Sequence, residues 1–216
     1  MLKLNVLENC KEFYGEYVEQ MQKIIAEGRV PISVAGLMQK RLNVKNINNS
    51  KGYYRDKYFD NYFDTGDAVV YHPDGRVKIV LDSQTLRNMM PSKKDNHALV
   101  LTEDVYKSLD GEELRDIKFD KIYCSLSKED VKSHPVWKIL ARDQALLNDY
   151  ADNIFAECKR RFSYDSAMAI CLSSAQGSTP EMRAWCVGRL WQDESIADGT
   201  LGLRIGFSRL LGILKD

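Results

Sequence analysis

Three aspartates follow a run of aromatic residues in the first third of the chain. Asp60 and Asp64 are four residues apart, which places them in one row of a helix, and Asp67 follows three residues later. Carboxylate oxygens are the preferred ligands of Mg²⁺ and Mn²⁺, so Asp60, Asp64 and Asp67 are candidate metal ligands. A row along one helix is nevertheless more typical of a solvated or partner-facing surface. We therefore expect no cofactor, with Mg²⁺ or Mn²⁺ as the alternative.

A candidate anion-binding residue lies near the C-terminus. Arg204 is flanked by Gly202 and Gly206 within an alternating segment. A guanidinium binds carboxylate or phosphate through paired hydrogen bonds, and glycines allow a ligand to approach closely. The same pattern also fits close packing of another protein element against the glycines. If Arg204 and the aspartates converge, the alternative function is a small metal-assisted hydrolase or phosphoryl-handling enzyme.

The sequence lacks the local motifs of common enzyme classes. It contains neither a glycine-rich phosphate loop nor G-x-S-x-G or H-E-x-x-H. His72, His97 and His134 are far apart in the chain, and no local pattern places a base beside a cysteine. We therefore expect a protein without intrinsic catalysis.

Tyrosines accompany the aspartates, because the phrase Tyr-Phe-Asp occurs at positions 58–60 and again at 62–64. On a helix, Tyr58 and Tyr62 would lie on an aromatic face beside the acidic row of Asp60 and Asp64. Tyrosines next to charged groups are effective contact residues in protein interfaces. The leading hypothesis is therefore an interaction or accessory protein that binds a protein partner through this segment or through the small-residue loop 173–179.

Nucleic-acid binding is a third possibility, although the total charge does not favour it. Lys plus Arg number 31 and Asp plus Glu also number 31, so the molecule as a whole does not attract phosphate backbones. A local basic patch would be needed. The candidates are a second N-terminal helix and an aromatic segment further along the chain: Gln39, Lys40 and Arg41, and Trp185 and Trp191 with Arg183 and Arg189. Core packing is the more common reason for both patterns, and we favour it.

Composition and cysteine spacing indicate a soluble, cytoplasmic, globular protein. The chain has 216 residues, 44% hydrophobic and 29% charged, which is ordinary for a folded domain. Its five cysteines are widely spaced, without a C-x-x-C pair, so we expect reduced thiols. The start of the sequence has no apolar signal-peptide core, and no apolar run approaches the ~20 residues that span a bilayer. We expect no contact with membranes.

Hydrophobic periodicity predicts the elements that must position these residues. Capping residues, turns and alternation predict helices over 8–27, 33–42, 53–66, 83–90, 103–109, 136–162 and 180–191, and strands over 69–71, 77–81, 98–101 and 201–208. His72-Pro73-Asp74-Gly75 has the chemistry of a hairpin turn.

These elements predict the fold class α+β. The expected architecture has an N-terminal helical pair, a central β-hairpin within a small, mostly antiparallel sheet, and a helix-rich C-terminal half that ends in a strand. We expect a single domain over residues 1–216, with a possible subdivision near 91–97.

Overall fold

The computed structural model describes residues 9–45, 57–89, 94–95, 98–115, 126–203 and 206–214. Its strands are β1 Cys10–Gly15, β2 Arg29–Pro31, β3 Phe63–Tyr71, β4 Val77–Val80, β5 Lys94–Asp95, β6 Ala98–Val100, β7 Glu112–Leu114, β8 Ile170–Cys171, β9 Glu181–Val187, β10 Ala197–Asp198 and β11 Ser208–Leu214. Its helices are α2 Tyr17–Ala26, α3 Val34–Lys45, α5 Gln84–Arg87, α6 Glu103–Ser108, α7 Lys128–Ser133, α8 Pro135–Ala141, α9 Gln144–Phe162 and α10 Leu190–Asp193.

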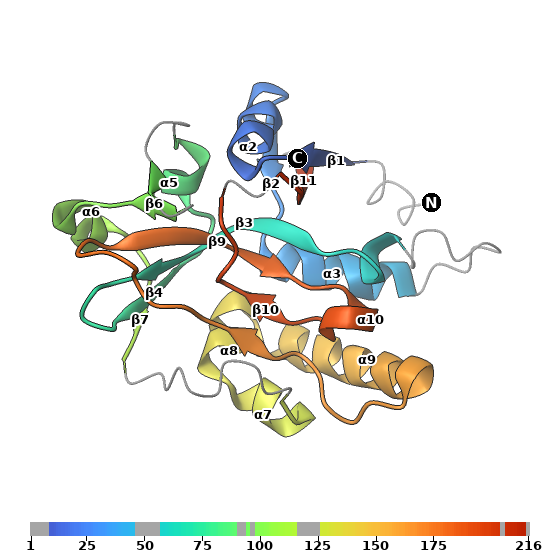
Figure 1. The fold of residues 1–216 in the computed structure, drawn as a ribbon. Helices are drawn as coiled ribbons and strands as arrows, with labels where there is room; N and C mark the ends of the chain where they lie inside the picture. Colours follow the sequence, from blue (N-terminus) through green and yellow to red (C-terminus); the bar gives the residue numbers. More distant parts are fainter. Residues whose placement is uncertain are drawn as a thin grey trace.

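The described strands form one 11-stranded sheet, whose main path is β1-β11-β3-β9-β10-β8. The sheet is mixed, because β11 pairs with β3 in parallel and β10 pairs with β8 in parallel, while the other pairs are antiparallel. The predicted small sheet is therefore wrong, because the sheet is large and mixed, although most of its strand pairs are antiparallel. The C-terminal strand β11 lies beside β1 and β3 (Figure 1), so sequence-distant segments build the centre of the fold.

The two central strands, β3 and β9, are buried on both faces. Val69 and Tyr71 of β3 belong to one hydrophobic core, while Ala68 and Val70 belong to a second core on the opposite face. This alternation follows from the two-residue period of a strand. The sheet therefore separates two apolar cores.

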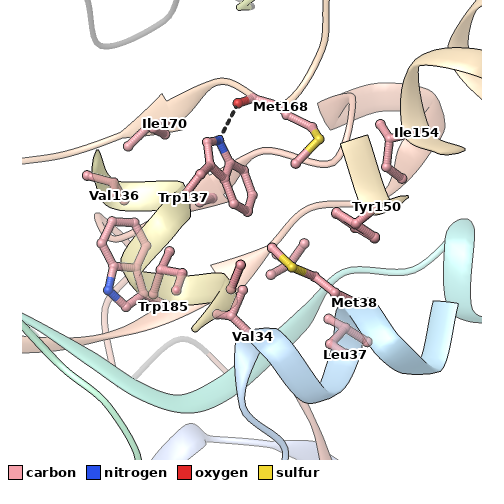
Figure 2. Packing of buried hydrophobic residues seen from close by; sticks show 14 of the residues in the cluster. Val34, Leu37, Met38, Val136, Trp137, Tyr150, Ile154, Met168, Ile170 and Trp185 are labelled. Carbon is pink, nitrogen blue, oxygen red and sulfur yellow. Dashed lines mark hydrogen bonds between the residues drawn. The ribbon is translucent and has the colours of Figure 1, made fainter. Parts of the chain in front are cut away.

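Helices α3, α8 and α9 contribute to the larger core. Figure 2 shows Trp137 of α8 packed among side chains from α3 and α9, and its indole Nε1 donates a hydrogen bond of 2.8 Å to the Met168 carbonyl. A buried tryptophan N–H needs such a partner. The smaller core receives Tyr17, Met21 and Ile24 from α2, which lies at the opposite end of the molecule from α7–α9 (Figure 1).

The first predicted helix is wrong over its first half. Residues Cys10–Gly15 form strand β1, and the helix begins only at Tyr17. Gly15 has φ +144°, so the chain turns there between the two elements. Phe13 and Tyr17 still enter the same core, which explains their helix-like spacing. The predicted pair of adjacent helices is consequently a strand followed by two helices that are separated by β2.

The helix predicted over the repeated Tyr-Phe-Asp phrase is also wrong. Helical structure covers only residues 57–59, and strand β3 begins at Phe63. The first part of that prediction, residues 53–56, lies outside the described residues. The first copy of the phrase therefore lies at the end of a short helical segment, and the second copy enters the central strand β3.

Three predictions in the C-terminal half differ from the structure. Residues 181–187 form the central strand β9 instead of a helix, since both faces of this segment are covered. In the alternating segment 201–208, residues 201–203 and 206–207 are not in a strand, and the final strand begins at Ser208. The predicted helix over 136–162 is two helices, because Arg142 adopts a left-handed conformation between α8 and α9.

Local signals were more dependable. The hairpin is confirmed, with Val70 opposite Lys78 and Tyr71 opposite Val77. Ser83, Thr102 and Ser127 cap α5, α6 and α7 through their side-chain oxygens, as their residue types predict.

Candidate functional site

A pocket of about 250 Å³ opens where β3, β9, β10 and β11 meet. Its polar lining residues are Tyr62, Asp64, Cys186, Arg189, Asp198 and Ser208. Apolar walls come from Ile196, Leu201 and Phe207. We call this cavity the Asp64 pocket. It combines one buried carboxylate with aromatic and aliphatic walls.

Asp64 is placed by its register in the sheet. It lies opposite Leu210 of β11 on one side and Cys186 of β9 on the other. Its Oδ2 accepts a hydrogen bond of 3.0 Å from the Arg209 backbone N–H. The β3–β9 register shifts between Asp64 and Ala68, and bulges of this kind commonly redirect side chains near functional sites.

Burial raises the pKa of Asp64 to about 6. Hydrogen bonds from the Arg209 backbone and from the Ser208 and Cys186 side chains favour the ionised form, whereas the negative charge of Asp198 disfavours it. The cost of desolvating the charged carboxylate is larger than the stabilisation from these hydrogen bonds, so the net effect is a raised pKa. Asp64 therefore titrates near pH 6, and a positive charge placed in the pocket would stabilise its ionised form.

Asp198 stands on β10 at the wall of the same pocket. Its Oδ1 accepts two hydrogen bonds of 2.7 Å from Thr200, one from the backbone N–H and one from the hydroxyl. These bonds fix the carboxylate in place. The pocket thus presents two carboxyl groups from neighbouring parts of the sheet.

Tyr62 forms a wall of the pocket and joins it to the surface. Its hydroxyl donates a hydrogen bond to the Phe207 carbonyl, and burial raises the pKa of Tyr62 to about 12, so the phenol stays protonated. The Arg189 guanidinium lies 6.0 Å from the Tyr62 ring centroid and 5.8 Å from that of Trp191. Such cation–π contacts connect the pocket to an outer aromatic surface.

Exposed aromatic side chains lie at the pocket or beside residues that line it. Phe207, Tyr14 and Trp191 are 65%, 58% and 47% exposed, the highest values among large apolar side chains in the described part of the chain. Tyr14 is close enough to Tyr62 to influence its pKa, and the Arg209 guanidinium lies 5.8 Å from the Tyr14 ring. We call Tyr14, Tyr62, Trp191 and Phe207 the aromatic rim.

A buried arginine holds the segments that carry the site. Arg41 of α3 is fully buried and donates five hydrogen bonds. Its acceptors lie on segments next to the pocket and on α9: the carbonyls of Tyr58, Asn61 and Gly188, and the hydroxyls of Tyr150 and Ser195. Asn61 precedes Tyr62 and Gly188 precedes Arg189, so Arg41 positions two pocket walls from behind.

The structure separates the predicted site residues. Tyr62 and Asp64 lie together in the pocket, whereas Tyr58 is a core residue. Asp60 accepts two hydrogen bonds from Arg161, at 2.9 and 3.1 Å. Arg204 lies outside the described residues.

Asp67 belongs to a different buried network. It accepts hydrogen bonds from the backbone N–H groups of Val34 and Asp82, and from Arg142 at 2.7 Å. Asp60, Asp64 and Asp67 therefore have separate partners. Within the described ranges, no group of three or more His, Cys, Asp or Glu side chains is arranged to hold a metal ion.

The residues considered for nucleic-acid contact are mostly interior. Lys40, Arg41 and Trp185 are buried, and Lys40 donates to the Cys10 thiol at 2.9 Å. Arg189 and Trp191 instead reach the aromatic rim. The cysteines at positions 10, 158, 171 and 186 form no disulfide, and Cys124 lies outside the described residues.

Sequence reasoning missed most of the aromatic rim and the second carboxylate. Tyr14 was assigned to a helix, and Asp198 and Phe207 had no partner within a few residues in the sequence. Only the sheet brings them together, because Tyr14 lies opposite Arg209 and Asp198 lies opposite Cys186. A usable signal was present in the alternating segment, where Phe207 falls at an apolar position next to glycine.

No protein-family profile matches this sequence, and a search of curated proteins finds no match. The fold is similar to that of a solved protein described as showing the accommodation of massive sequence variation in Nanoarchaeota by the C-type lectin fold. The TM-score is 0.69 at 16% identity, over 94% of this chain and 97% of that one. The chain therefore has a C-type lectin-like fold, which replaces the predicted helix-rich α+β layout. No described helix is long and apolar enough to cross a membrane.

Proposed function

We propose that this chain is a binding protein without intrinsic catalysis, which recognises a protein partner through the aromatic rim and the Asp64 pocket. The observation that carries this proposal is that exposed Phe207 lines the cavity, while exposed Tyr14 and Trp191 lie near its lining residues Tyr62 and Arg189. Aromatic residues and arginine are enriched in protein interfaces and supply much of their binding energy. The expected cytoplasmic location belongs to the same proposal.

The framework behind the rim supports a binding role. Strands β9 and β11 supply pocket residues while their other side chains pack into the two cores. The similar protein from Nanoarchaeota accommodates massive sequence variation on a C-type lectin fold. Such a framework is suited to a binding surface whose residues can change without loss of the fold, and the partner must therefore be inferred from this chain's own site.

Selection of binding peptides from a random displayed library tests this function. The immobilised protein is expected to enrich peptides whose binding is lost in a variant carrying Tyr14→Ser, Trp191→Ser and Phe207→Ser. The matched control carries Val100→Ser, Val105→Ser and Tyr164→Ser, which alter three exposed apolar side chains away from the pocket. Thermal melting confirms that both variants are folded.

Two results would overturn the proposal. One is the failure to enrich any peptide that binds the purified protein in solution. The other is equal binding of the enriched peptides to the wild type and to the rim variant, because this would place their contacts elsewhere.

A further inference from the structure

The Asp64 pocket has the size of a site for one side chain. Its volume is about 250 Å³, whereas sites for drug-sized ligands usually enclose about 300–1,000 Å³. It opens beside the exposed ring of Phe207. A side chain that projects from a partner bound to the aromatic rim would therefore enter the pocket end-first.

The groups around the pocket determine which side chain fits. Asp64 lies on β3 and Asp198 on β10, and both carboxyl groups line the cavity. The other neighbours of the Asp64 carboxylate are the neutral donors Ser208 and Cys186 and the backbone N–H of Arg209. A cationic end would interact favourably with both carboxylates, and its aliphatic stem would contact the apolar wall.

The guanidinium of Arg189 also lines the pocket and would repel an entering cation, but the two carboxylates of Asp64 and Asp198 outnumber it when Asp64 is ionised. Arg189 lies over the rings of Tyr62 and Trp191, and the guanidinium of Arg209 lies over the rings of Tyr14 and Phe63. These contacts also show that the faces of the rim accept cations. Phe207 presents a further exposed ring at the entrance.

We infer that the Asp64 pocket binds the basic side chain, Lys or Arg, of a protein partner, an inference that rests on the proposed binding function of the aromatic rim. The ammonium or guanidinium group lies between Asp64 and Asp198, and the alkyl stem runs along Leu201 and Phe207. The site recognises a positive charge, so its occupancy depends on the ionisation of Asp64.

The backbone amide of Arg209 offers a direct readout, because it donates to Asp64. The probes are N-acetyl-lysine methylamide and N-acetyl-arginine methylamide, with N-acetyl-norleucine methylamide as the neutral control. In two-dimensional ¹H–¹⁵N NMR at pH 7.5, at least one basic probe shifts the Arg209 amide saturably at millimolar concentration, and the neutral probe does not. Absence of a saturable shift with either basic probe, or an equal shift with the neutral one, overturns the inference.

The charge of Asp64 gives a second test. Asp64→Asn keeps the size of the side chain and an acceptor for the Arg209 amide, and we expect it to weaken binding of the basic probe about tenfold or more. Asp165→Asn removes an exposed carboxylate outside the pocket and serves as the matched control. Equal affinities for the wild type and Asp64→Asn would overturn the inference.

The pH dependence follows from the same charge. Burial places the pKa of Asp64 at about 6, so lowering the pH from 7.5 to 5 neutralises most of the carboxylate. The affinity for the basic probe is expected to fall about tenfold over this range in the wild type and to change much less in Asp64→Asn. Affinity that is unchanged or rises towards pH 5 contradicts the inference.

These outcomes separate this inference from the function on which it rests. If library peptides bind the aromatic rim but the basic probes do not enter the pocket, the partner does not use a basic side chain and the binding function stands. If the probes bind while every library peptide ignores the rim, the binding function in its proposed form fails.

Discussion

Arg41 and Asp64 are both buried, yet their surroundings differ. Arg41 is enclosed by protein and donates five hydrogen bonds, all to neutral carbonyl or hydroxyl oxygens. Asp64 accepts hydrogen bonds on one side and faces a cavity on the other. A guanidinium has five N–H donors, so Arg41 uses its full capacity within the protein.

This difference indicates which buried polar group serves the fold and which serves binding. A group whose donors all have hydrogen-bond partners within the protein has no donor left for a ligand, and its removal leaves several acceptors without a partner. A desolvated carboxylate that lines a pocket can still gain from an added positive charge. We therefore assign Arg41 a structural role and Asp64 a recognition role, and substitutions at each should have different consequences.

The largest expected effect is that of Arg41→Met. The substitution keeps an apolar stem but removes every donor, which leaves five oxygens in the interior without their partner. We expect a loss of roughly 3–5 kcal/mol in the free energy of unfolding, measured by urea denaturation. Should the purified variant not fold, Arg41→Lys, which keeps the charge and three donors, is expected to fold with a smaller loss. A loss below about 1 kcal/mol for Arg41→Met would contradict the structural role.

Asp64→Asn should instead increase the free energy of unfolding at neutral pH. Because the pKa of Asp64 is raised to about 6 in the folded protein, from ~4 in an unfolded chain, the folded state binds this proton more tightly. The resulting stabilisation is present below about pH 4 and is lost as the pH rises through 6, so the wild type is penalised at neutral pH. We expect the stability of Asp64→Asn relative to the wild type to increase by roughly 2 kcal/mol between pH 4 and pH 7.5.

Urea unfolding of both proteins at a series of pH values measures this change. The difference between the two proteins removes the contribution of carboxylates that do not interact with Asp64, and leaves that of Asp64 and its coupling to Asp198. A difference that stays constant with pH, or that favours the wild type more strongly as the pH rises, would show that Asp64 is not desolvated as the structure indicates.

The two regions also differ in how far sequence predicts them. The hairpin follows from a few adjacent residues and was predicted correctly, and Ser83, Thr102 and Ser127 occupy cap positions that suit their residue types. The central strand β9 was predicted to be a helix, because Thr179-Pro180-Glu181 has the residue types of a helix start and Met182, Trp185, Cys186 and Leu190 are spaced as on one face of a helix. Its neighbours β3, β6 and β10 cover its edges and the cores cover its faces, so tertiary contacts override the local preference.

In the Asp64 pocket, too, tertiary contacts decide the arrangement and the local sequence does not. Tyr62 and Asp64 were selected from one repeated phrase, but the phrase was placed on a helix, which would have put Asp60 and Asp64 in one row. In the structure Asp60 pairs with Arg161 before the strand begins, and Asp64 enters the sheet beside Arg209. Pairing across 145 residues leaves no local pattern, so the sequence could identify these residues but not their partners.

Tyr150→Phe tests the Arg41 network in a smaller step. The Tyr150 hydroxyl accepts from Arg41 at 2.7 Å and is 2.7 Å from the Ser195 hydroxyl. Its loss leaves Ser195 as the remaining acceptor for the same guanidinium nitrogen. We expect a loss of about 1–2 kcal/mol by urea denaturation, with peptide binding at the rim unchanged. A loss as large as that of Arg41→Met would mean that the network fails as a unit.

Ser208→Ala should give the smallest effect and bears on Asp64 alone. The Ser208 side chain donates a hydrogen bond that favours the ionised carboxylate, so its removal should raise the pKa of Asp64 above 6. A neutral hydrogen bond contributes about 0.5–1.5 kcal/mol, which corresponds to about half to one pKa unit. NMR titration of the Asp64 carboxyl carbon measures the shift, and Ser133→Ala, which alters an exposed hydroxyl on α7, is the control. A downward shift would mean that Ser208 accepts a hydrogen bond from the protonated Asp64 carboxyl and so favours its neutral form.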